Sequence, residues 1–145
     1  MTLGSVQPGA EVWTVGKDGT NAIPLGALVV PDTATTPDSY KVAPAAAGVL
    51  GPFAVCVNKA AAAADTAFAA AFPNSLVTVK AQGAIEPAAL VYPSATVAGS
   101  VSATAGTQGI AGRYVGHENE ITGKTPATAA ADGETNIVIR LGGAG

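Results

Sequence analysis

Residues that form tight turns interrupt this chain about every 8–12 residues, and the runs between them are short and apolar. Asp18-Gly19, Pro31-Asp32, Pro93-Ser94 and Asp132-Gly133 are clear examples of these turn signals. Runs of this length suit β-strands but are too short for most helices. The spacing therefore predicts a mainly β fold, a small β-barrel or sandwich, with at most one or two short helices.

Alternation of apolar and polar residues locates the strands. Segment 75–82 (SLVTVKAQ) alternates most regularly, with Val77, Val79 and Ala81 predicted to point inward and Thr78 and Lys80 outward. Taken together, the runs predict strands over residues 11–15, 23–30, 40–42, 49–58, 75–82, 88–92, 96–103, 109–118 and 134–141.

One helix is predicted, at the end of the alanine-rich stretch 60–72. Asp65 can cap its N-terminus, and Pro73 would end it. Phe68 and Phe72 are four residues apart, a spacing that places them on one helix face. The helix would have about two turns at most, and an ordered loop is the alternative.

The length of 145 residues fits one domain with a core of its own. Residues 1–9 contain Gly4, Pro8 and Gly9 without periodicity, so they are predicted to form a flexible N-terminal arm. Residues 10–142 are predicted to form a single β domain without an internal repeat of fixed period, and residues 143–145 a flexible C-terminal end.

Composition argues against several classes of protein. The net charge is -3 and the seven Lys and Arg residues are scattered, so no basic face for nucleic acid is expected. No apolar run approaches the roughly 20 residues of a membrane helix. The N-terminus lacks the charged and apolar regions of a signal peptide, so synthesis in a cytoplasm is expected. A single cysteine cannot form an intrachain disulfide.

The segment His117-Glu-Asn-Glu120 is the only cluster that resembles a catalytic or metal site, and it contains the only histidine. A zinc-protease HExxH motif would need a second histidine at position 121, which is Ile121. On a strand, Glu118 and Glu120 would face away from His117. A solvated strand end is therefore expected, with no catalytic residue, no metal and no cofactor, and the chain is predicted not to be an enzyme.

Three other features of the sequence are explained by structural roles. Cys56 lies in an apolar run, which predicts a buried and unreactive thiol. The glycines at 106, 109, 112 and 116 fit no phosphate-binding motif and predict turns and a bulge. Trp13 follows the predicted arm; a core position is favoured for it, and an exposed contact anchor is the alternative.

Several segments have a succession of predicted strands and turns that is known from other proteins. They are Ala81–Val91 followed by Pro93–Val101, then Ile110–Gly116, and the closing Asn136–Gly142. Together, over about residues 10–142, the chain resembles the small capsid decoration proteins of tailed bacteriophages, also called cement or head-stabilising proteins. The resemblance implies a mostly β, β-tulip-like domain, often trimeric, on the outside of the phage head.

On that resemblance, the expected partners are the major capsid protein and two further copies of this chain, and the expected location is the capsid exterior. The N-terminal arm would add a strand to an exposed sheet edge of the shell. The candidate shell-contact residues are Thr2, Leu3, Val6 and Trp13. One alternative is a carbohydrate- or host-surface-binding β module of a phage fibre or baseplate; another is a small hydrolase that uses His117.

Overall fold

The structure of the protein, a computed structural model, describes residues 3–7, 10–32, 39–118, 120 and 128–142. It is mainly β, so the predicted fold class is confirmed. The described residues form ten strands: β1 (Val12–Gly16), β2 (Leu28–Asp32), β3 (Ser39–Val42), β4 (Ala54–Cys56), β5 (Ala67–Ala71), β6 (Leu76–Val79), β7 (Leu90–Pro93), β8 (Val101–Ser102), β9 (Gly112–His117) and β10 (Ile137–Leu141).

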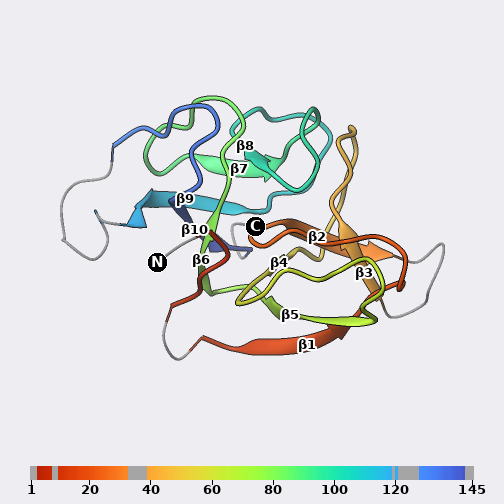
Figure 1. The fold of residues 1–145 in the computed structure, drawn as a ribbon. Coiled ribbons are helices and arrows are strands. Elements are labelled where there is room, and N and C mark those ends of the chain that lie inside the picture. The colour runs from red at the N-terminus through yellow and green to blue at the C-terminus, as the bar shows by residue number, and fades with distance from the viewer. Residues whose placement is uncertain (1–2, 8–9, 33–38, 119, 121–127, 143–145) are drawn as a thin grey trace.

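The first five strands close into a barrel in the order β1-β3-β2-β4-β5. Strand β1 is antiparallel to β5 along its whole length. Among the described residues, its other edge meets β3 at one parallel pair, Gly16 opposite Ser39. Strand β1 therefore lies at the outside of the molecule, where Figure 1 shows it as the lowest strand.

The last five strands form a second sheet in the order β6-β10-β9-β7-β8. Read in the opposite direction around a closed ring, this order is that of the first barrel. Strands β6, β8, β7, β9 and β10 then correspond to β1, β3, β2, β4 and β5. A parallel bridge between Ala81 and Val101 joins the β6 and β8 ends, as Gly16 and Ser39 join β1 and β3. The two halves therefore share one topology, and they lie one above the other in Figure 1.

The repeat has a short trace in the sequence. Ala27-Leu-Val-Val-Pro31 and Ala89-Leu-Val-Tyr-Pro93 occupy the same place in the two halves. Just before these segments, Ile23 and Ile85 form corresponding antiparallel bridges with alanines of their own halves. The expectation of no internal repeat concerned a fixed period, and the loops between corresponding strands differ in length. The structural duplication therefore does not appear in the sequence as a repeat of one fixed period.

Two apolar clusters hold the fold together. The smaller one fills the first barrel with alternate residues of its strands, which explains why alanine and cysteine serve as core residues there. The larger one contains residues of both halves, including Leu28 and Val55 of the first and Tyr114 and Ile139 of the second. The outer face of the first barrel therefore packs into a core that it shares with the second sheet.

The predicted helix over residues 65–72 is wrong, because Ala67–Ala71 forms strand β5. A spacing of four residues places two side chains on one face of a strand as well as of a helix. Phe68 and Phe72 both pack against the interior of the first barrel, whereas Ala71 packs into the shared core. Pairing with β1 and β4 stabilises the extended backbone of this segment.

The described part of the predicted N-terminal arm lies along β6. The amide of Gly4 donates to the carbonyl of Thr78 at 3.0 Å, and the amide of Thr78 donates to the carbonyl of Ser5 at 3.0 Å. Val6 lies opposite Val77 in an antiparallel bridge. An arm that stands free of the domain is therefore not found over residues 3–7; residues 1–2, 8–9 and 143–145 lie outside the described ranges.

Thr78, predicted to point outward, is fully buried. Strand β6 has neighbours along both edges, β10 on one side and residues 4–7 on the other. The inward residues Val77, Val79 and Ala81 are in the shared core, as predicted.

Candidate functional site

His117, the last residue of β9, lies between two carboxylates. Its Nδ1 is 3.2 Å from Oε1 of Glu120, and its Nε2 contacts Oε2 of Glu134. The expectation that Glu120 would face away from His117 is wrong. The chain turns after His117, so that a carboxylate of Glu120 returns to the backbone amide and the ring of His117.

Tyr114 and Thr128 complete this cluster. The Tyr114 hydroxyl donates to the carbonyl of Thr128 at 2.6 Å and lies 3.1 Å from Nδ1 of His117. The amide of Thr128 donates to Glu120 Oε2 at 3.0 Å, and its hydroxyl contacts Oε1. The cluster therefore holds the segment around Thr128 and Glu134 against the end of β9.

The environment of the cluster lowers the pKa values of its two carboxyl groups and raises the pKa of Tyr114. A hydrogen bond from the Thr128 side chain is the main cause that lowers the pKa of Glu120. For Glu134, a hydrogen bond from the backbone amide of Ala131 is the main cause that lowers the pKa. Burial raises the pKa of Tyr114 to about 12, with help from the two nearby carboxylates. Both carboxylates are therefore favoured in their charged form.

This arrangement serves to hold segments of the chain together. The carboxylates of Glu120 and Glu134 contact different nitrogens of the His117 ring, so they do not converge on a common point. Within the described ranges, no group of three or more His, Cys, Asp or Glu side chains could hold a metal ion.

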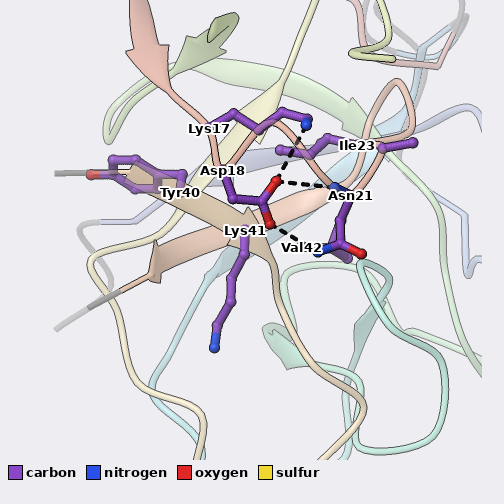
Figure 2. A pocket seen from close by; sticks show the side chains of 8 residues that line it. Lys17, Asp18, Asn21, Ile23, Tyr40, Lys41 and Val42 are labelled. Carbon is purple, nitrogen blue, oxygen red and sulfur yellow. Dashed lines mark hydrogen bonds and ion pairs between the residues drawn. The ribbon is translucent and has the colours of Figure 1, made fainter. Parts of the chain in front are cut away.

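A groove of about 280 Å³ lies beside the turn after β1, lined in part by Lys17, Asp18, Asn21, Tyr40 and Lys41. Lys17 is buried, and its amine donates to backbone carbonyls of the 63–65 loop at 2.8 and 3.0 Å. The Asp18 carboxylate accepts hydrogen bonds from the Asn21 amide and side chain (Figure 2). The exposed Lys41 side chain points away from this network (Figure 2).

The Asp18-Gly19 turn forms as predicted, with φ of +76° at Gly19. Backbone hydrogen bonds from Asn21 and Thr20 are the main causes that lower the pKa of Asp18. The turn does not close a hairpin, because β1 and β2 are separated by β3 in the barrel. The polar groups of the groove are thus engaged in shaping this connection.

A third feature is an exposed apolar surface on β1. Trp13 is 55% exposed and Val12 is 37% exposed, so the core position favoured for Trp13 is wrong. Together with Thr14, Val15 and Phe72, Trp13 lines a shallow hollow of about 180 Å³. Val15 of the same strand packs against the barrel interior, so the exposed apolar residues lie at the start of β1. Adjacent exposed apolar residues of this kind are typical of a contact surface.

The four candidate contact residues have different surroundings. Leu3 and Val6 are half-buried, Leu3 against Gly26 and Val6 against the shared core. Thr2 lies outside the described ranges. Among the three described members of the set, Trp13 alone is exposed, and Val12 beside it was not singled out from the sequence.

The other predictions from the sequence concern structure. Cys56 is fully buried as predicted, and burial raises the pKa of its thiol to about 11. A register shift between Val138 and Ile139 leaves Val115 as an extra residue of β9, next to Gly116 with φ of +136°. The bulge expected among the glycines is therefore present.

In the ranges that the structure describes, no helix is long and apolar enough to cross a membrane. Comparison with known proteins finds no family model that matches the chain, no matching curated protein and no matching solved structure.

Proposed function

We propose that this protein is a structural component of a tailed-phage head, which binds the outside of the capsid and stabilises contacts between major capsid subunits. The observation that carries the proposal is the exposed apolar strand β1, with Trp13 55% exposed, in a domain whose His117 and Cys56 are engaged or buried. The resemblance of segments 81–101, 110–116 and 136–142 to decoration proteins supports the same conclusion.

Trp13 has the properties of an interface anchor. Tryptophan is enriched among the residues that contribute most to binding, because it buries a large apolar area with little loss of conformational freedom. Val12 and the hollow beside Trp13 extend the apolar surface along β1. In a symmetric trimer, three such surfaces would bind neighbouring capsid subunits at once, so that modest single contacts give a durable complex.

The alternative of a carbohydrate-binding module depends on exposed aromatic rings. Trp13 is such a ring, but Tyr114 is fully buried, and Tyr40 packs edge-on against Phe72 with ring centroids 6.0 Å apart. The described aromatic side chains therefore do not form an extended sugar-stacking platform, and assembly is the better explanation of the Trp13 surface.

Shells of the encoding phage, prepared without this protein, provide the test. We expect the purified protein to bind expanded shells and to raise their temperature of disruption. Trp13→Ala is expected to weaken binding about tenfold or more. Leu50→Ala is the matched control, since Leu50 is also a large exposed apolar residue, 65% exposed, but does not belong to β1. Failure of the unaltered protein to bind these shells would overturn the proposal, and specific binding to a glycan array would favour the alternative.

A further inference from the structure

Strand β1 has a definite place in the ladder of the first half. Trp13 lies opposite Ala70 of β5, and Ala70 lies opposite Cys56 of β4. The amide of Cys56 donates in turn to the carbonyl of Ala27 at 3.0 Å. This row of residues crosses the barrel from the repeated Ala27 segment to the outer strand.

The second half contains the same row. Val77 of β6 lies opposite Ile139 of β10, which lies opposite Tyr114 of β9. The amide of Tyr114 donates to the carbonyl of Ala89 at 3.0 Å. Because Ala27 and Ala89 are corresponding residues of the repeat, Val77 corresponds to Trp13, and residues 76–78 correspond to residues 12–14.

The outer edge of β6 is occupied by the N-terminal segment. Thr78 both donates to Ser5 and accepts from Gly4, each at 3.0 Å, and the carbonyl of Leu76 accepts from the amide of Gln7 at 3.1 Å. These bonds have the antiparallel pattern of an added strand. Residues 76 and 78 therefore direct their backbone groups toward the outer edge.

The corresponding edge of β1 is open in the described part of the chain. By the same alternation, the backbone groups of Val12 and Thr14 point away from β5, and among the described residues Gly16 alone has a strand partner on that side. Trp13 is 55% exposed beside this edge, whereas its counterpart Val77 lies in the shared core and is 1% exposed.

We propose that the edge of β1 binds an extended strand of a partner protein, antiparallel to β1 and built from uncharged small and aliphatic residues. The occupant of the equivalent edge defines this chemistry, because residues 4–7 (GSVQ) carry no charge and place Val6 opposite Val77. An aliphatic residue of the partner would lie beside Trp13, next to the hollow of about 180 Å³. Backbone hydrogen bonds would give the affinity.

The identity of the partner rests on the proposed function, in which the major capsid protein supplies the strand. The chemistry of the edge can be tested without a shell. The probe is a synthetic peptide of residues 2–7 (TLGSVQ) with blocked ends, added to the full-length protein. Trp13 is the single tryptophan, so its fluorescence reports directly on this site.

We expect the peptide to shift the Trp13 emission to shorter wavelength and, at saturation, to slow hydrogen exchange of the Thr14 amide about tenfold or more. Thr14→Pro removes the outward N–H, a change that strand edges tolerate, and should weaken peptide binding at least about tenfold. Thr14→Val keeps the N–H and is the matched control, so it should bind as the unaltered protein does. If Thr14→Pro does not fold, protection of the Thr14 amide in the unaltered protein decides the question.

Absence of peptide binding, or equal binding by Thr14→Pro and Thr14→Val, would overturn strand addition at this edge. The result is separable from the shell experiment. Shell binding without peptide binding would leave the decoration role and reject the strand, whereas peptide binding without shell binding would support the open edge and reject the decoration role.

Discussion

The hydroxyl of Tyr114 donates a 2.6 Å hydrogen bond to the backbone carbonyl of Thr128 and so connects the core to a surface segment. Tyr114 is fully buried, and its ring is part of the core that the two halves share. The bond ties the chain ahead of β10 to the middle of β9.

Tyr114→Phe removes this hydroxyl without changing the shape of the ring. We expect the free energy of unfolding to fall by about 1 kcal/mol, because the carbonyl of Thr128 and the His117 cluster lose a hydrogen-bond partner. Urea denaturation measures the change. Tyr92→Phe is the matched control, since the half-buried Tyr92 hydroxyl has no partner within the described ranges; a larger loss for Tyr92→Phe would contradict the assignment.

Acid is expected to weaken the cluster around His117. The pKa values of Glu120 and Glu134 are lowered in the folded protein, so these groups stabilise it above their unfolded pKa values, and this contribution is lost as pH falls through the folded values. Unfolding midpoints measured from about pH 5 to about pH 3 should therefore decrease. The double variant Glu120→Gln and Glu134→Gln should be less stable at neutral pH and show a weaker decrease.

A variant of the exposed Glu86, Glu86→Gln, is the control for this pH dependence and should retain the full decrease. If the unfolding midpoint of the double variant decreased with pH as much as that of the unaltered protein, other carboxylates would be the cause of the acid sensitivity.

The buried amine of Lys17 is expected to stabilise the loop before β5. Lys17→Met would leave the carbonyls of Ala63 and Asp65 without their donor, so the free energy of unfolding should fall by about 2 kcal/mol. Lys41→Met, a change at an exposed lysine of the same groove, should alter it by less than about 0.5 kcal/mol. Equal effects in thermal or urea denaturation would contradict this role of Lys17.

The thiol of Cys56 should be unreactive while the protein is folded. Burial raises its pKa to about 11, and the thiolate is the reactive form. An aromatic disulfide reagent at neutral pH should therefore modify Cys56 only as fast as the protein unfolds. Rapid modification under native conditions, without loss of structure, would show that the first barrel opens locally around β4.

Patterns that depend on neighbouring residues were predicted well from the sequence. The alternation in residues 75–82 located β6, and Asp18-Gly19 located a turn with positive φ. The i,i+4 spacing of Phe68 and Phe72 was misread, because that spacing fits one face of a strand as well as of a helix. Strand partners on both sides decided this segment, and they come from distant parts of the chain.

The sites were harder to predict for the same reason. Glu134 reaches His117 from 17 positions away, which no local spacing reveals. The exposure of Trp13 likewise depends on how β1 packs in the tertiary structure, where it pairs along one edge with β5. The only available signal was a run of apolar residues, Val12 and Trp13 in succession, that would use both faces of a short strand.

By itself, the sequence determined the β class, the Asp18-Gly19 and Asp132-Gly133 turns and the scarcity of reactive side chains, because these depend on local backbone preference and composition. The predicted turn at Pro31-Asp32 is wrong, because both residues belong to β2. Only the tertiary structure decided that the chain folds as two similar halves, and that residues 4–7 pair with the outer edge of β6, whereas in the described ranges Gly16 alone pairs on the outer edge of β1. Similar short strands can pair in many ways, and long-range burial and backbone hydrogen bonding select one arrangement among them.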